Sequence, residues 1–577
     1  MKIQSVATAL RKHGLDAPQL AALKPDRANY KLCLLQPTGD ITYDPIGVRH
    51  TNAAQAAPQF AGFLNEAIAR GADLAITPEY SMPWDVLTTA LKEGRRPSEG
   101  KLWALGCESI RYEDLIALRD DLSPIATFIF DDVSASPGAF LDPLAYVFWA
   151  PPKRGKTAKL VVLVQFKTEP MSDPQNFEVN HLKLGQAIYQ FGDAKSVTLT
   201  SFICSDVLKF DDSVAAAVHD RGLILHIQLN PNPRHTLFRA YRDKLLGMNG
   251  DATELICLNW ASGVSMSAGS NPVEWNTPSN SAWYLKPEQF NRDDAVLEAN
   301  HQNGLYYTYA RGHRLHALFF NYAPALFELE ATKVAHIGQT AIAKRTGPNL
   351  KARLIWNGAA WELADAADDG FGGVVAQAGA AQTQLQALST TNPVWTERLL
   401  ALTAGSIGHT EDWHCVKQLD SCAIDQNEFI RRMTFCQDTD QTAVSFRSHR
   451  LKLCGHLVTT VQTTTLPPAL ADLSAGFELK WRPDHPHQNA FAAGGDAATV
   501  IYMGETATDA DMRKTRDRLS EFLRRSIPDP QKALQSRQRL TIWYRDGLGQ
   551  LQIFEPHTMT TIDDPKTSSP LDFAREK

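Results

Sequence analysis

The amino-acid sequence predicts an α/β fold for about the first 330 residues, because long apolar runs alternate there with segments of helical periodicity. Runs that are apolar at nearly every position are typical of strands buried on both faces of a sheet. A second observation is that a polar residue stands at or just past the carboxyl end of four of these runs: Glu79, Lys167, Cys204 and Asn230. Ligand sites of α/β proteins gather at that edge of the sheet. The two observations together predict the fold class and the edge that carries the site.

The elements follow in chain order. Residues 1–28 are expected to form a short amphipathic helical lead-in, because Ile3, Val6 and Leu10 recur at helical spacing. A helix is predicted over 57–71, ending at Gly71. Buried strands are predicted over 30–37, 73–80, 101–109, 123–132, 142–151, 161–167, 196–206, 223–231 and 253–262. The first domain is expected to span residues 29–330.

The composition changes after about residue 325. Residues 331–390 are expected to be a linker or connecting segment, because the stretch 358–388 is rich in Ala, Gly and Asp. Residues 391–577 are expected to form a second, smaller α+β domain, for which the sequence indicates no role. Its predicted elements are helices near 393–404 and 509–526 and a hairpin over 540–556 with an Asp-Gly turn.

Composition and charge exclude several classes of protein. A net charge of −6 lacks the basic excess that nucleic-acid binding normally requires. No window approaches the roughly 18 consecutive apolar residues of a membrane span. The N-terminal segment lacks the long apolar run of a secretory signal, because Arg11, Lys12 and His13 interrupt it. Eight cysteines without a CxxC pair indicate reduced thiols. We therefore expect a soluble, cytoplasmic protein.

Three residues of the predicted sheet edge have the chemistry needed to hydrolyse a carbon–nitrogen bond. The thiolate of a cysteine such as Cys204 is a strong nucleophile. A carboxylate such as Glu79 can accept the thiol proton and later activate water. The ammonium group of Lys167 and a backbone N–H can stabilise the negative charge that develops on the substrate. These residue types occur in many proteins, so the local motifs have to decide between families.

The motifs around these residues resemble those of the nitrilase superfamily. Glu79 lies in LAITPEY, similar to the family's apolar strand followed by Pro-Glu-aromatic. Lys167 begins a stretch, KTEPMSDPQNFE, that resembles the family's lysine, proline-containing loop and further glutamate. Glu178 is the match for that second acid, and Glu169 competes with it. Cys204 lies in TSFICSD, similar to the family's cysteine after an apolar strand, and the order Glu, Lys, Cys agrees as well.

This resemblance covers about residues 30–325. It implies a nitrilase-like four-layer α-β-β-α sandwich with Cys204 as nucleophile, Glu79 as base and Lys167 as oxyanion partner. The implied activity is hydrolysis of a non-peptide carbon–nitrogen bond in a small molecule, an amide in preference to a nitrile, through a thioester. The implied mechanism uses no metal and no organic cofactor. Family members commonly dimerise, so a homo-oligomer is expected too.

Two features depart from the family pattern. Ser205 stands where an aromatic residue usually follows the nucleophile, and LKFDDSVAAAV replaces a Pro-Glu-Arg type stretch. A divergent member with an altered substrate pocket is therefore indicated. The alternative is a regulatory or anti-phage defence effector, in which the nitrilase-like domain senses or binds a small ligand and the C-terminal region binds a protein partner. Rapid alkylation of Cys204 at neutral pH would favour the enzyme.

Other candidate residues are interpreted as structural. Asp206 is expected to be a structural hydrogen-bonding residue, and Cys33, Cys107 and Cys257 are expected to be inert core thiols. The exposed basic residues of the helix at 509–526 are expected to be a solvated surface, because acidic residues are interspersed among them.

Five residues of the second region have side chains that can bind zinc. Their spacing is irregular, whereas structural zinc sites prefer two tight pairs of ligands, so no metal is predicted. The five are His409, His414, Cys415, Cys422 and Cys436.

Overall fold

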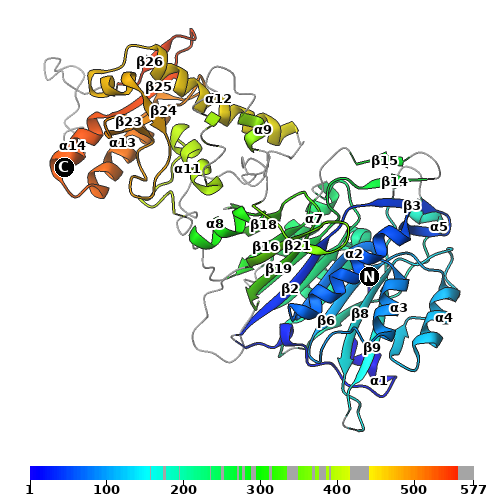
Figure 1. Cartoon of the computed structure of the whole chain (residues 1–577). Helices are drawn as coiled ribbons and strands as arrows, with labels where there is room; N and C mark the ends of the chain where they lie inside the picture. Colours follow the sequence, from blue (N-terminus) through cyan, green and yellow to red (C-terminus); the bar gives the residue numbers. More distant parts are fainter. Residues whose placement is uncertain are drawn as a thin grey trace. The chain divides into compact units, whose positions relative to one another are not determined.

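The computed structural model describes residues 1–26, 28–155, 157–172, 177–193, 195–233, 236–248, 252–268, 272–275, 280–287, 294–310, 315–333, 348–366, 371–375, 385–386, 388, 392–415 and 441–555. The chain divides into two compact units (Figure 1). The first unit contains residues 1–374, 392–394 and 415–447, and the second contains residues 375–391, 395–414 and 448–577.

The first unit contains a nine-stranded sheet with the order β21-β20-β19-β2-β5-β6-β8-β9-β7. At its centre β2, β5 and β6 run parallel, and β8 is antiparallel to both β6 and β9. In sheet order the strands are Trp361–Leu363, Asn349–Trp356, Ala325–Thr332, Asn29–Gln36, Leu74–Met82, Leu102–Cys107, Pro143–Ala150, Lys159–Phe166 and Thr127–Phe130.

A second, eight-stranded sheet has the order β1-β10-β11-β12-β13-β16-β18-β17. Its central strands β11, β12 and β13 are parallel, and β12 is buried at every position. In sheet order the strands are Ile3–Ser5, Ile188–Phe191, Thr198–Ile203, Gly222–Ile227, Ala252–Leu258, Ala282–Pro287, Leu315–Phe320 and Leu305–Ala310.

The two sheets contact each other, and helices cover them. Strand β5 contacts β12 and β13, and the Gln165 side chain donates to the Ser201 carbonyl across the interface at 2.9 Å. One hydrophobic cluster joins the nine-stranded sheet to α2 (Ala53–Ala69), α3 (Trp84–Lys92) and α4 (Tyr112–Leu122). Another joins the eight-stranded sheet to α6 (Asp212–Val218) and α7 (Thr236–Gly247). The predicted α/β class is confirmed.

The first strand, β1, differs from the helical lead-in expected there. Ile3 pairs with Ile188 of β10, and the helix α1 begins only at Val6 and ends at Arg11. The spacing of only three apolar residues, Ile3, Val6 and Leu10, is weak evidence for a helix. Pairing with the edge of β10 determined the extended conformation of Ile3.

Two strands, β20 and β21, come from the segment 331–390 that was expected to connect the domains. They extend the nine-stranded sheet beyond β19. Trp356 and Trp361 pack on α2 at Gly62, where a Cβ atom would come within 3.1 Å of Trp361. Burial of these two indole rings against α2 explains why this part of the segment belongs to the sheet.

The second unit contains a five-stranded sheet with the order β22-β23-β24-β25-β26. Helices α13 (Asp509–Ser526) and α14 (Pro530–Gln538) contact its strands. The predicted hairpin is confirmed, because β25 and β26 pair antiparallel. The strands are Phe477–Leu479, Ala490–Ala492, Ala497–Tyr502, Leu540–Arg545 and Leu551–Ile553, and the remaining long helices are α11 (Pro393–Thr403) and α12 (Gln441–Thr463). Throughout the described ranges, every helix is too short or too polar to cross a lipid bilayer.

Candidate active site

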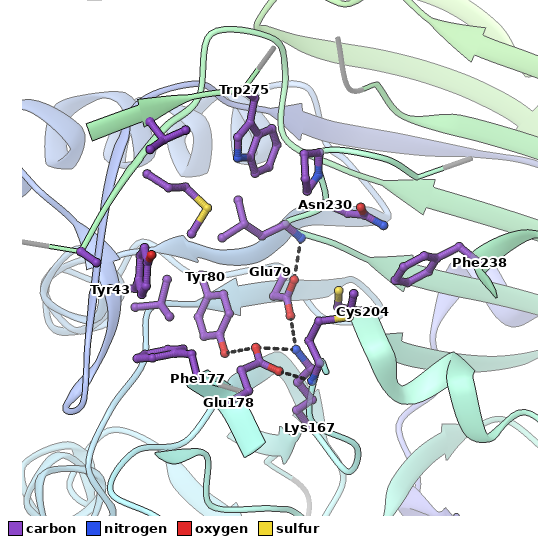
Figure 2. Close-up of a pocket in the computed structure, with 17 residues that line it drawn as sticks. Tyr43, Glu79, Tyr80, Lys167, Phe177, Glu178, Cys204, Asn230, Phe238 and Trp275 are labelled. Carbon is purple, nitrogen blue, oxygen red and sulfur yellow. Dashed lines mark hydrogen bonds and ion pairs between the residues drawn. The ribbon is translucent and has the colours of Figure 1, made fainter. Parts of the chain in front are cut away.

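A cavity of about 730 Å³ lies in the first unit where strands of both large sheets end (Figure 2). Glu79, Lys167 and Cys204, which come from three separate strands in the sequence, all line it. Glu178 is a second acidic side chain on its wall. The structure therefore brings the three predicted site residues into one cavity.

Glu79 reaches the cavity because its strand, β5, bulges. The register between β5 and β6 shifts between Thr77 and Met82, and Tyr80 has a φ of 55°. Gly106 on β6 makes room for the bulge, since a Cβ atom there would lie 2.1 Å from the carbonyl oxygen of Pro78. The buried carboxylate then accepts hydrogen bonds at both oxygens, from Lys167 at 2.8 Å and from the backbone N–H of Leu229 at 2.5 Å.

Lys167 follows β9 directly and is 1 % exposed. Its Nζ lies 2.8 Å from Glu79 Oε1, 2.8 Å from Glu178 Oε1 and 3.5 Å from Asp142 Oδ2. Burial alone lowers the pKa of Lys167, but the charges of Glu178 and Glu79 outweigh burial and leave the pKa well above its usual value. The side chain is therefore an ammonium ion in a nearly dry site.

Glu178 lies on the short helix α5 (Phe177–His181), and its Oε1 accepts a hydrogen bond from Lys167. Its Oε1 also accepts from the Tyr80 hydroxyl at 3.0 Å, and its Oε2 accepts from the Met171 backbone N–H at 2.6 Å. Glu169, the competing candidate, instead forms an ion pair with Lys209. The sequence did not decide which of the two acids lies beside Lys167, and in the structure it is Glu178.

Cys204 begins the 3₁₀ helix η2 (Cys204–Lys209) directly after β11 and has a φ of 39°. A non-glycine residue in this left-handed region is strained, and the surrounding structure has to hold it there. The carbonyl of Cys204 accepts from His226 Nε2 at 2.9 Å. The Asp206 carboxylate accepts from the backbone N–H groups of Ile203 at 2.9 Å and Thr168 at 2.7 Å. Asp206 therefore has the structural role that was predicted for it, because it ties β11 to the loop after Lys167.

The thiol of Cys204 is 4 % exposed. Burial raises its pKa well above the usual value, the charge of Glu79 raises it further, and the charge of Lys167 lowers it only in part. Burial also raises the pKa of Glu79, although the charge of Lys167 opposes this. Burial thus raises the pKa of both the thiol and the carboxyl group, and the charge of Glu79 contributes to the shift at Cys204.

Asp142 is a buried acid that the sequence analysis missed. It precedes β8, and its carboxyl group lies within 4.8 Å of those of Glu79 and Glu178. Burial and the charge of Glu79 raise its pKa well above the usual value. The sequence contained an indication of this residue, because Asp142 is an acid at the amino end of the strand predicted over 142–151. Antiparallel pairing of β8 with β9 brings that end to the same edge as Lys167.

The three carboxyl groups of Glu79, Asp142 and Glu178 have the composition of a site for a hard cation. The ammonium group of Lys167 already lies among all three, at 2.8, 3.5 and 2.8 Å. A metal ion at that position would meet the lysine charge, so this cluster does not fit a metal.

The backbone of Asn230, the fourth polar residue of the predicted edge, is hydrogen-bonded to the side chain of Asn259. Its backbone N–H donates to Asn259 Oδ1 at 3.1 Å, and Asn259 Nδ2 donates back to its carbonyl at 2.8 Å. Next to Asn259, Trp260 donates from Nε1 to the backbone carbonyl of Glu79 at 2.8 Å. Asn259 and Trp260 therefore support the backbones of two residues that line the cavity.

The structure describes three of the five residues that were considered as zinc ligands, His409, His414 and Cys415. Arg518 donates to His409, and the ring of His414 packs against those of Trp481 and His487. Cys422 and Cys436 lie outside the described residues.

The known proteins to which the chain is similar are solved structures. No protein-family model matches the chain, and no curated protein matches it. The chain is similar to an amidase from Nesterenkonia sp., with 15 % identity and a TM-score of 0.28 over 53 % of this chain and 92 % of that one. It is also similar to a cysteine-to-alanine mutant of the Nesterenkonia AN1 amidase from the nitrilase superfamily, with 16 % identity and a TM-score of 0.26 over 45 % and 84 %. Both similarities extend over about half of this chain.

Proposed function

We propose that the first unit is a hydrolase that cleaves a non-peptide carbon–nitrogen bond, an amide in preference to a nitrile, through a thioester on Cys204. The observation that carries the proposal is the ammonium group of Lys167, which is bound by Glu79 and Glu178 on the wall of the cavity that Cys204 also lines. We further propose that this unit has a nitrilase-like four-layer α-β-β-α arrangement, with residues 391–577 as a separate domain.

The first step forms a carbon–sulfur bond. Glu79 accepts the thiol proton while the sulfur of Cys204 attacks the amide carbon, and the carbonyl electron pair moves onto oxygen. The Lys167 ammonium and the backbone N–H of Ser205 stabilise this oxyanion. Because Lys167 is already charged and held by two carboxylates, little reorganisation accompanies the development of charge.

The second step breaks the carbon–nitrogen bond. The oxyanion collapses, and the nitrogen leaves as ammonia or an amine after it takes the proton from Glu79. The acyl group remains on Cys204 as a thioester. Glu79, again a carboxylate, then accepts a proton from water as the water attacks the thioester. The sulfur leaves and recovers the proton, and the acid product departs. Every proton in this sequence passes through Glu79.

Glu178 has a positioning role in this scheme. Its Oε1 holds the ammonium group while its Oε2 is anchored by the Met171 backbone N–H. Glu79 is anchored in a comparable way by the Leu229 backbone N–H. These backbone contacts keep both carboxylates on Lys167, which leaves its remaining N–H available for the oxyanion.

The test is the alkylation rate of individual thiols at neutral pH, read by peptide mass spectrometry of the full chain. We expect Cys204 to react much faster than the other seven cysteines, and Glu79→Gln to slow it at least ~10-fold. Glu169→Gln is the matched control, because that acid pairs with Lys209 instead. Incubation of wild-type protein with amides should give an acyl adduct by intact mass that Cys204→Ala lacks. Uniformly slow labelling with no adduct would contradict the proposal and favour the ligand-sensing alternative.

A further inference from the structure

Apart from Glu79, Lys167, Glu178 and Cys204, the residues that line the cavity are predominantly apolar and aromatic. Four of them, Tyr43, Val48, Met266 and Val273, come from a four-stranded sheet, β15-β14-β3-β4, formed by Pro272–Glu274, Ser265–Ser267, Asp40–Asp44 and Gly47–His50. Figure 2 shows Tyr43, Phe177, Phe238 and Trp275 around the cavity, with Cys204 and Lys167 at one end. The carboxylates, the ammonium group and the thiol therefore lie at one end, and the rest of the lining is mostly hydrocarbon and aromatic rings, with Asn230 as a polar exception.

The cavity is large for the reaction alone. Its volume of about 730 Å³ lies within the range of about 300–1,000 Å³ that is typical of sites for larger organic ligands. A carboxamide group at Cys204 would occupy a small part of it. A substrate with no further substituent would leave the aromatic walls in contact with water, so binding free energy would be lost.

The two carboxylates at the Cys204 end of the cavity are already hydrogen-bonded to the protein. Glu178 accepts from Lys167, Tyr80 and Met171, and Glu79 accepts from Lys167 and Leu229. Every oxygen of these two carboxylates therefore already has a protein donor, with which an ammonium group of a substrate would have to share it. Burial of a substrate cation without an anionic partner of its own is costly.

A substrate carboxylate meets a different obstacle. Lys167 is the single cation among the described residues that line the cavity, and it is bound between Glu79 and Glu178. Among the groups that line the cavity, carboxylates therefore outnumber the ammonium group by two to one. A carboxylate on the substrate would therefore be repelled by these acids and would lack a counter-ion.

We infer that the substrate is an uncharged amide that carries a bulky apolar group, aliphatic or aromatic, which the walls of this cavity bury. This inference rests on the proposed function and names the substrate class of the same site. The apolar group belongs either to the acyl side or to the nitrogen side of the amide bond, and both place the same hydrocarbon in the cavity.

The first experiment measures kcat/KM of the full chain for primary amides of straight-chain acids from two to eight carbons. We expect about a fourfold rise for each added methylene until the cavity is full. Amides of equal length that end in a carboxylate or an ammonium group should react at least ~100-fold more slowly than the neutral ones. A parallel series of N-alkyl acetamides shows which side of the bond carries the apolar group. A flat series, or a preference for a charged amide, would overturn the inference.

Two variants connect the preference to the walls. Trp275→Ala should lower kcat/KM for octanamide at least ~10-fold and change the value for acetamide little, because the smaller amide does not reach that wall. Met266→Lys introduces a cation on the apolar wall and should raise the relative rate for the amide with a terminal carboxylate. If Trp275→Ala lowers both amides equally and Met266→Lys leaves the ratio unchanged, the walls do not select the substrate.

Alkylation separates this inference from the proposed hydrolysis. Rates at Cys204 are measured with iodoacetate, iodoacetamide and N-hexyl iodoacetamide, each divided by its rate with glutathione. We expect the order hexyl derivative, iodoacetamide, iodoacetate. This order without any amide turnover would refute the hydrolase and keep the apolar ligand class. Turnover combined with the reverse order would refute the apolar class and keep the hydrolase.

Discussion

Lys167 Nζ and Glu79 Oε1 are 2.8 Å apart, and both side chains are 1 % exposed. A buried ion pair of this kind adds little to stability by itself, because both groups lose their hydration. Its value lies in the charged states that it maintains. Lys167 stays an ammonium ion although it is buried, and Glu79 stays close enough to Cys204 to influence the pKa of the thiol.

Replacing the ammonium group should destabilise the protein as well as inactivate it. Lys167→Met leaves Glu79 and Glu178 buried without a cation, and we expect a loss of about 3–5 kcal/mol in the free energy of unfolding. The measurement is urea denaturation at neutral pH. The double variant Lys167→Met/Glu178→Gln should recover part of this stability and none of the amide hydrolysis. A single variant as stable as wild type would mean that the carboxyl groups do not need the lysine charge.

The pH dependence of stability should report the proton on Asp142. Its pKa is raised in the folded protein, so the native state holds a proton that the unfolded state loses above the ordinary Asp pKa of about 4. The stabilisation is complete below that pH and is lost as the pH rises toward the folded pKa, by up to about 1.4 kcal/mol per pH unit. Asp142→Asn should reduce this slope, and the part that remains belongs to other acids with a raised pKa, such as Glu108 and Asp206. Parallel urea titrations from pH 5 to pH 8 give the comparison, and identical slopes for the two proteins would contradict it.

The reactivity of Cys204 should depend on pH in a way that reveals its base. Burial raises the pKa of the thiol, so without help it would react only at pH values above those of an ordinary cysteine. In wild type, Glu79 accepts the proton, and alkylation should already be rapid near neutral pH. In Glu79→Gln the rate should instead increase steadily into the alkaline range. Labelling from pH 6 to pH 10 distinguishes the two profiles, and superimposable curves would exclude Glu79 as the base.

The bulge that carries Glu79 should depend on Gly106. A Cβ atom at Gly106 would lie 2.1 Å from the Pro78 carbonyl oxygen, so Gly106→Ala must displace the backbone beside Glu79. We expect a loss of about 1–3 kcal/mol or more in the free energy of unfolding and a large loss of Cys204 reactivity. Gly247→Ala is the control, because no atom lies within 4 Å of its added Cβ. Equal stability and reactivity of the two variants would show that the bulge tolerates the methyl group.

Much of the fold could be predicted from the sequence because its signals are local. Strands such as β5 and β12 are buried at every position, and each contains a short apolar run, at 74–76 and 223–225, that is visible in the sequence. The three candidate site residues stood out for the same reason, since each is a polar residue at the end of such a run. Because the carboxyl ends of parallel strands meet at one edge of a sheet, the sequence alone predicted the edge that carries Glu79, Lys167 and Cys204.

Other features depended on partners that are distant along the chain. Asp142 lies in the site because β8 runs antiparallel to β9. The sequence of β8 does not indicate in which direction the strand runs in the sheet. Glu178 could be separated from Glu169 only by the contacts of their side chains with Lys167 and Lys209. Strands β1 and β20 joined their sheets because an edge was available to pair with them. Local sequence determines which segments can be buried, whereas strand direction and pairing are decided by the free energy of the assembled sheet, which only the tertiary structure contains.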